Sequence, residues 1–292
     1  MLQNRLCQSA AIALLFAAPL LAQSGAVPNA VTITGRGPET YVLLSGLVGG
    51  VAGFRRLQAV LLADGNRVVV IDPYNLSVDS TDVTFAALAR RVDALLASHA
   101  MTSVRVIGHA HGGGVALRLA ANYPNRVSSL CLLDVGALPG NRTSVFGASL
   151  RWLPMISRLP GGREFLRGRI IHGLEKNSGH TAWLDSASRR DYTEPLLTNL
   201  DRLVSLARRL GAAREPDSLP TLVSRIRVPV LVIIGDVPHA SGLNPGELDA
   251  LHPLGALLHI EHVSAAGHFV HEEAPAEVAR YLVRAKARSP IY

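Results

Sequence analysis

The sequence predicts an α/β fold, with a doubly wound, mostly parallel sheet and an inserted helical cap. Short apolar runs such as residues 68–71 and 130–133 lack polar alternation, which is typical of strands buried on both faces. Helical patterns separate these runs, and such an order favours parallel strands joined by crossover helices. Between residues 136 and 220 the pattern changes to arginine-rich helical stretches. We therefore predict a core made of residues 27–135 and 221–292, with residues 136–220 as the cap.

Each predicted strand is a short run of apolar and β-branched residues. Residues 31–34 and 41–44 are separated by Gly-Arg-Gly-Pro, which predicts an opening hairpin. Further along the chain, the predicted strands are residues 68–71, 104–107, 127–133, 228–234 and 257–260.

Each predicted helix repeats apolar residues every three or four positions. Phe85, Leu88 and Val92, for example, fall on one side of a helix over residues 85–97. The predicted helices of the core are residues 54–63, 85–97, 115–123 and 274–284, and those of the cap are residues 150–156, 163–171 and 195–210.

Residues 1–26 have the composition of a secretory signal peptide. Arg5 gives the N-terminal region its positive charge, residues 10–22 form the apolar region, and the small residues 24–26 form a cleavage site. The apolar run is shorter than the roughly 20 residues of a comfortable transmembrane helix. We therefore expect export to the periplasm or the medium, with an uncleaved N-terminal membrane anchor as the alternative. No later segment is expected to span a membrane.

The chain carries a formal net charge of +7 at pH 7, and residues 142–215 hold thirteen basic against seven acidic side chains. A nucleic-acid-binding surface would require a dense basic run with interleaved aromatic residues, which the sequence does not contain. The expected partner is a small-molecule substrate or ligand, and a basic cap would favour acidic ones.

Residues 104–124 carry the most informative motif. An apolar strand end is followed by Gly108-His109-Ala110-His111-Gly112 and then by helical spacing. Strand, sharp glycine turn and helix form the context of the G-x-S-x-G nucleophile elbow. Ala110 stands where that motif has its serine, and a methyl group cannot attack a carbonyl.

Three segments, residues 108–127, 226–236 and 265–282, give this chain a resemblance to the α/β-hydrolase superfamily. They read GHAHGGGVALRLAANYPNRV, IRVPVLVIIGD and AAGHFVHEEAPAEVARYL. The chain is most similar to the capped branch, which includes epoxide hydrolases, haloalkane dehalogenases and carbon–carbon bond hydrolases. The resemblance covers about residues 41–282 and implies the α/β-hydrolase fold.

The resemblance also implies roles for individual residues. His268 stands at the position of the general base, on a loop after the last predicted strand. The backbone N–H groups of Leu47 and His111 stand where the family forms its oxyanion hole. The family usually begins the glycine-rich loop that contains Leu47 with His-Gly, and in this chain Ser45-Gly46 stands there.

The acid that would pair with His268 is left open. The family usually places it three residues after the glycine that ends the penultimate strand, and that position is Pro238. Asp236, one residue after Gly235, is one candidate. Asp134, at the end of the strand that follows the elbow, is the other. The third alternative is that neither serves.

Two functions remain open. The first is an atypical hydrolase in which His268 activates water against a small reactive carbonyl or imine, without a covalent serine intermediate. The resemblance offers a parallel, since the aminoacrylate hydrolases of pyrimidine degradation also carry Gly-His-Ala at the elbow. The second is a non-catalytic pseudo-hydrolase that binds a small apolar or anionic ligand under the cap.

A metal or a cofactor is not expected. Several histidines fall near the predicted site, but their spacing in the sequence does not match a metal-ligand motif. They are His109, His111, His239, His268 and His271. His109 occupies the variable position of the elbow and is expected to be structural, and His271 is expected at the start of a helix.

Overall fold

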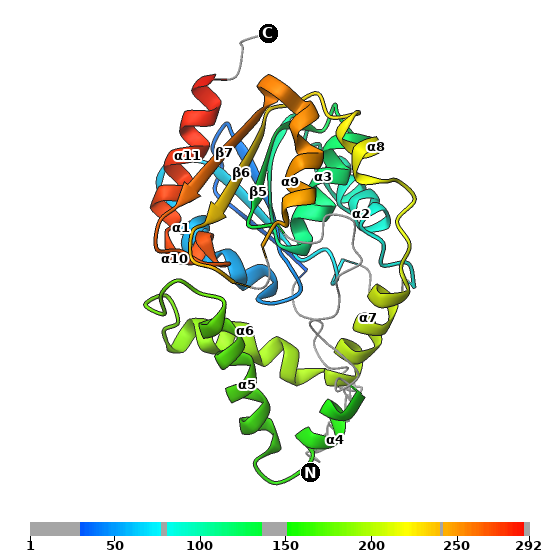
Figure 1. The fold of residues 1–292 in the computed structure, drawn as a ribbon, viewed down its shortest axis with the longest axis vertical. Helices are drawn as coiled ribbons and strands as arrows, with labels where there is room; N and C mark the ends of the chain where they lie inside the picture. Colours follow the sequence, from blue (N-terminus) through cyan, green and yellow to red (C-terminus); the bar gives the residue numbers. More distant parts are fainter. Residues whose placement is uncertain (1–29, 77–80, 136–150, 240–241, 289–292) are drawn as a thin grey trace, which may run out of the picture.

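A seven-stranded sheet lies at the centre of the protein, whose computed structural model describes residues 30–76, 81–135, 151–239 and 242–288 (Figure 1). The order across the sheet is β1-β3-β2-β4-β5-β6-β7. β1 is antiparallel to β3 and the other pairs are parallel, which confirms the predicted fold class. The strands are β1 Val31–Thr34, β2 Thr40–Leu44, β3 Arg67–Ile71, β4 Val104–His109, β5 Val127–Leu133, β6 Val230–Gly235 and β7 Leu258–Val263.

The predicted opening hairpin is wrong. β1 does not pair with β2 but lies antiparallel to β3, with Val31 opposite Ile71. β2 has a strand on each side, because Tyr41 lies opposite Val68 of β3 and opposite Arg105 of β4. The first strand therefore pairs at the outer edge of β3, where backbone N–H and C=O groups remain open.

Helices cover both faces of the sheet, as expected for a doubly wound fold (Figure 1). One face carries α2, α3, α8 and α9, and the other carries α1, α10 and α11. Their bounds are α1 Arg55–Ala63, α2 Phe85–Ser98, α3 His111–Asn122, α8 Leu219–Val223, α9 Pro245–Leu251, α10 Val270–Glu273 and α11 Pro275–Arg288. The strands alternate their side chains between two apolar layers, so Val42 packs on one face and Leu43 on the other.

Four more helices lie beyond the ends at which the strand arrows point (Figure 1). They are α4 Leu153–Ser157, α5 Gly162–Lys176, α6 Ser186–Thr198 and α7 Leu200–Ala212. We call residues 151–212 the helical segment. It corresponds to the middle of the predicted cap, whose residues 136–150 lie outside the described part of the chain.

The helical segment is attached to the short 3₁₀ turn η1 (Gly50–Phe54) and to the start of α1. The hydroxyl of Tyr192 donates to the carbonyl of Gly53 at 3.1 Å. Asp185 accepts from Arg55 at 3.3 Å and from Arg56 at 3.0 Å. These contacts place the segment over the carboxyl edge of the sheet, where open α/β sheets bind their ligands.

Within the described residues, no helix has both the length and the apolar character needed to cross a bilayer. The predicted leader, residues 1–26, lies outside the described part of the chain.

Candidate active site

The turn between β4 and α3 has the backbone of a nucleophile elbow. Ala110 has φ 49° and ψ −122°, a backbone conformation that residues other than glycine rarely adopt. A Cβ added at Gly112 would lie 2.1 Å from the carbonyl oxygen of Leu44, and one added at Gly108 would lie 2.5 Å from that of Gly112. Both positions therefore require glycine, because α3 starts so close to the sheet.

His268 and Asp134 meet at the carboxyl edge of the sheet. The ring Nδ1 of His268 lies 2.6 Å from Oδ2 of Asp134, whose side chain is fully buried. Burial pushes the pKa of Asp134 upward, but hydrogen bonds from His239 and His268 outweigh it, so this pKa lies below its ordinary value. An ionised carboxylate can only accept, so Nδ1 carries the proton and Nε2 keeps its lone pair whenever the ring is neutral.

A second imidazole shares this carboxylate. Nε2 of His239 lies 3.2 Å from the same Oδ2 of Asp134, and its side chain is almost fully buried. His239 follows Pro238, in the loop where the resemblance placed the acid. Sequence reasoning missed this role, because only the three-dimensional path of the loop brings a histidine there back to the end of β5.

Asp236, the other candidate acid, is turned away from His268. Its Oδ1 lies 2.9 Å from Nδ1 of His262, and both side chains are about half exposed. Its Oδ2 accepts from Ser264 at 3.5 Å. The structure thus brings Asp134, and not Asp236, to His268.

The backbone on either side of the His268 ring is held from two directions. The N–H of His268 donates to the carbonyl of Asn177, in the helical segment, at 2.8 Å. Nε2 of His109 lies 3.0 Å from the carbonyl oxygen of His268 and therefore carries a proton to donate. His109 was expected to be structural. Through this contact it anchors residues 264–269, the loop between β7 and α10 that carries His268 and that we call the histidine loop.

Glu273 connects the histidine loop to the helical segment. Its Oε1 accepts from the N–H groups of Gly267 at 3.0 Å and Phe269 at 3.2 Å, one on each side of His268. Its Oε2 accepts from Gly179 at 2.7 Å and His180 at 3.1 Å. One buried carboxylate therefore satisfies four backbone donors. The run of two glutamates after His271 was the only sequence signal, and it does not reveal these partners.

The segment expected to supply half of the oxyanion hole lies against the elbow. A Cβ added at Gly46 would lie 3.3 Å from the Cβ of Ala110. Leu47 follows directly, and His111 is the first residue of α3, so its N–H has no acceptor within that helix. Both predicted donors thus belong to chain segments that border Ala110.

Three further histidines around His268 are held neutral by burial. Burial lowers the pKa of His111 to about 4 and that of His271 to about 3, and it keeps the pKa of His109 well below its ordinary value. His271 lies at the start of α10, as expected, with its ring centroid 4.7 Å from that of Phe54 and 4.2 Å from that of His109. These three imidazoles are therefore uncharged next to His268, whereas the carboxylate of Asp134 is ionised.

Asp134, His239 and His268 could also act as metal ligands. Each offers one ligand atom, and these atoms lie within 4.8 Å of one another. One carboxylate and two imidazoles form a donor set that suits Zn²⁺. In the structure the same atoms are joined by hydrogen bonds, and a metal on Nδ1 of His268 would have to displace its proton. No metal was expected from the sequence, because the spacing of these residues does not match a metal-ligand motif.

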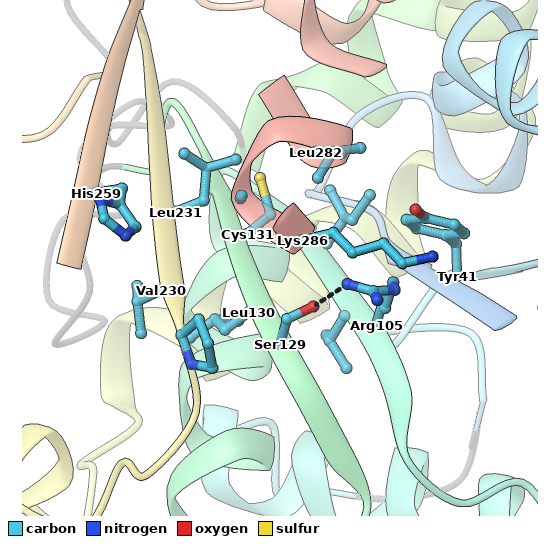
Figure 2. Close-up of a pocket in the computed structure, with 14 residues that line it drawn as sticks. Tyr41, Arg105, Ser129, Leu130, Cys131, Val230, Leu231, His259, Leu282 and Lys286 are labelled. Atoms are coloured by element: carbon cyan, nitrogen blue, oxygen red, sulfur yellow. Dashed lines mark hydrogen bonds between the residues drawn. The ribbon is translucent and has the colours of Figure 1, made fainter. Parts of the chain in front are cut away.

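Figure 2 shows a hollow at the opposite, amino-terminal end of the strands. Early residues of five strands line it, among them Arg105, Ser129 and Val230, together with Lys286 of α11. Arg105 donates to Ser129 at 3.4 Å and to Glu39 at 3.0 Å, so polar groups here bind one another. None of the predicted site residues lines this hollow.

Known proteins resemble this chain in sequence. A family model described as "Alpha/beta hydrolase family" matches residues 41–281. The sn-1-specific diacylglycerol lipase ABHD11 of Mus musculus is 26% identical over 249 residues, which cover 80% of this chain and 76% of that protein. RutD of Variovorax paradoxus, named as a proposed carbamate hydrolase, is 30% identical over 201 residues, which cover 66% of this chain and 72% of that protein.

Solved structures share the fold at low identity. A bacterial membrane phospholipase A superposes with a TM-score of 0.68 at 21% identity, over 88% of this chain and 82% of that one. An esterase from Thermogutta terrifontis superposes with a TM-score of 0.66 at 22% identity, over 89% and 94% of the two chains.

Proposed function

Because this chain belongs to the alpha/beta hydrolase family, we propose that it is a hydrolase in which His268 activates a water molecule while Ala110 leaves the position of the nucleophile vacant. The 2.6 Å contact between His268 and Asp134 carries this proposal. A buried carboxylate on Nδ1 fixes the orientation of the ring and stabilises the imidazolium that forms when Nε2 takes a proton.

The reaction needs no covalent enzyme intermediate. Nε2 of His268 takes a proton from water, and the hydroxide adds to the carbonyl or imine carbon of the substrate. Backbone N–H groups of Leu47 and His111 stabilise the negative charge that develops on the substrate. When a carbonyl adduct collapses, the protonated ring returns its proton to the leaving group. An imine adduct takes that proton on nitrogen, and the proton of its new hydroxyl then passes through the ring to the same nitrogen as the C=O bond forms and the C–N bond breaks. Atoms and charge are then balanced, and His268 is again neutral.

A small, reactive substrate fits this site better than a stable amide. An oxyanion hole with substrate binding retains about 10³–10⁴-fold acceleration when a triad residue is lost. Such a rate suffices only where the uncatalysed reaction is already fast. The similarity to RutD supports a carbonyl compound with a good leaving group, such as a carbamate. The similarity to a diacylglycerol lipase supports ester chemistry of the same type.

Ala110 itself favours a second candidate, a pseudo-hydrolase that binds a small apolar or anionic ligand without turnover. The contacts that hold the His268 loop, from Asn177 and Glu273, also join the helical segment to the core. Packing alone could therefore preserve the loop in a protein that has lost catalysis.

The test is turnover of small carbamates, imines and activated aryl esters by the wild type and by His268→Ala, Asp134→Asn and Asp236→Asn. We expect turnover in the wild type that is lost in the first two variants. Asp236→Asn is the matched control and should keep wild-type activity, because its carboxylate faces His262. Ligand binding without turnover would favour the pseudo-hydrolase, and turnover unaffected by His268→Ala would contradict the hydrolase proposal.

We also propose that the protein is exported from the cytoplasm. The basic start and apolar run within residues 1–26 support it. Expression of the full chain with a C-terminal tag, followed by N-terminal sequencing of the exported fraction, should give a start near residue 27, after the small residues 24–26, or near residue 23 if the leader is cleaved after Ala22. A chain retained with Met1 in the membrane fraction would instead support the uncleaved anchor.

A further inference from the structure

An apolar surface lies at one corner of the helical segment. Of the large apolar side chains that are exposed in the described chain, four lie there: Trp152, Met155, Leu159 and Phe165, which are 48%, 51%, 56% and 59% exposed. We call residues 151–169, which form α4 and the first turns of α5, the α4–α5 corner. A cluster of this kind on a protein surface usually marks a site of interaction.

The geometry of α4 explains why these side chains face outward. Trp152 is the N-cap of α4 and lies three residues before Met155, and Leu159 follows in the turn that ends the helix, where its N–H donates to the carbonyl of Ile156. Leu153 and Ile156 point the other way and pack against the buried cluster of Leu166, Leu197 and Leu200. The inner side of α4 is therefore packed, whereas Trp152 and Met155 stay about half exposed.

The α4–α5 corner is rich in arginine. Its residues 151–169 include five arginines and one acidic residue, Glu164, which pairs with Arg167. The guanidinium of Arg151 lies 5.1 Å from the centre of the Trp152 ring. Arg158 and Arg169 are exposed, and neither forms an ion pair with any residue that the structure describes. The corner thus combines exposed apolar side chains with uncompensated positive charge.

We propose that the α4–α5 corner docks the protein on the surface of an anionic lipid bilayer. Trp152, Leu159 and Phe165 would enter the boundary between headgroups and acyl chains, where aromatic side chains are favoured. Arg158 and Arg169 would bind lipid phosphates while their aliphatic stems lie along the apolar surface.

Charge favours a bilayer over a second copy of this chain. A symmetric dimer through the corner would bring the same arginines from both copies together, and like charges in contact oppose association. A membrane with phosphate headgroups has the opposite sign. Figure 1 shows α4 at the end of the molecule farthest from the sheet, so a bilayer could contact the corner without meeting the core.

Tryptophan fluorescence makes the docking measurable without a substrate. The chain has two tryptophans; Trp152 is 48% exposed and Trp183 is 1% exposed. Phosphatidylcholine vesicles that contain phosphatidylglycerol should shift the emission of the wild type to shorter wavelength, and the protein should sediment with them. Trp152→Phe should still sediment but lose the shift, since the emission of buried Trp183 does not change.

Charge and apolar contact are tested separately. Arg158→Glu with Arg169→Glu should weaken sedimentation with the anionic vesicles by about tenfold or more, and Leu159→Ser with Phe165→Ser should do the same. Val283→Ser with Arg284→Glu, on exposed positions of α11, is the matched control and should bind as the wild type does. All of these positions are exposed, so the variants should fold.

Two results would overturn the proposal. One is equal sedimentation of the corner variants and the α11 control. The other is a dimer in solution, measured by light scattering, that dissociates in the Leu159→Ser, Phe165→Ser variant, because the corner would then be covered by a second copy. Both readouts are independent of the proposed hydrolase activity, which can fail while docking holds.

Discussion

Ala110 combines the backbone of a nucleophile with a side chain that cannot react. Its φ of 49° is imposed by the close approach of α3 to the sheet rather than by the alanine itself. A serine at position 110 should not require a change of this backbone conformation, because it adds only a hydroxyl group to the Cβ of alanine. The effect of adding this hydroxyl can therefore be predicted from the geometry of the elbow.

Ala110→Ser should create or raise esterase activity on short activated esters. Its Oγ would be placed by the elbow, next to the segments of Leu47 and His111. An aryl acetate assay and covalent labelling by a fluorophosphonate probe measure the gain, and the wild type should stay unlabelled. The control is Ala110→Ser combined with His268→Ala. No gain of the single variant over the double variant would show that the site has lost more than its nucleophile.

At the scale of the residue, sequence motifs singled out His268 as the candidate base but did not reveal its surroundings. Asp134 and Asp236 both follow strands, so the sequence could not decide which of them reaches the ring. The decision depends on the direction of each side chain, which is set by the positive φ of 42° at Asp134 and by the contact of Asp236 with His262. His239 comes from a different loop, and no local pattern reports such a long-range contact.

At the scale of the element, strands were predictable and their pairing was only partly so. Apolar runs such as β3 and β5 identify buried parallel strands, because both of their faces must be covered. β1 was predicted as a strand, but its partner depends on which edge of the sheet remains open. The pairing partner of β1 depends on the whole sheet, so the residues Val31–Thr34 alone do not indicate it.

Glu273 offers a test of how the helical segment and the histidine loop are joined. Glu273→Gln replaces one carboxylate oxygen by an NH₂ group that faces backbone donors, so two of four hydrogen bonds are lost. We expect a fall of about 1–3 kcal/mol in the free energy of unfolding, together with slower turnover. Urea denaturation measures the first. Glu277→Gln, on α11, is the control, and equal stability of the two variants would contradict this role of Glu273.

The elbow helix α3 is held by a buried ion pair. Nε of Arg118 lies 2.8 Å from Glu215, with side chains 1% and 8% exposed, and Glu215 also accepts from the N–H of Phe85 at the start of α2. Glu215→Ala should lower the free energy of unfolding by about 3–5 kcal/mol, because it leaves a buried guanidinium without its carboxylate.

The matched control for this change is Asp217→Ala. Asp217 pairs with Arg225 at 3.0 Å, and these side chains are 23% and 44% exposed. Loss of such a surface pair should cost about 1 kcal/mol or less. Thermal unfolding of both variants gives the comparison, and similar losses of stability would show that burial of Arg118 does not have the expected effect.

At the scale of the whole molecule, buried histidines should make stability depend on pH. In the folded chain the pKa values of His111 and His271 are about 4 and about 3, and that of His109 is also depressed, whereas unfolded histidine titrates near about 6.5. Below about pH 6.5 the unfolded chain therefore binds more protons, so stability falls as the pH falls. Glu272, whose pKa is raised to about 8, acts in the opposite direction and offsets about one histidine.

We expect the free energy of unfolding to fall by about 3 kcal/mol in total between pH 6.5 and pH 5, with a slope that steepens toward the net effect of about two protons near pH 5. Urea denaturation across this range measures the slope. His271→Gln should make the slope shallower, since one histidine that cannot be protonated in the fold has been removed. A flat profile, or an unchanged slope in that variant, would contradict the account of these histidines.

The helical segment, the elbow and the histidine loop together enclose the site at which we propose that His268, paired with Asp134, acts as the base while Ala110 stands at the position of the nucleophile. The most direct test is the rate at which the wild type and His268→Ala hydrolyse the same activated carbonyl substrate. The account predicts that the variant is slower by about 100-fold or more, since general base catalysis contributes about 10²–10⁴-fold. Equal rates in the two proteins would contradict it.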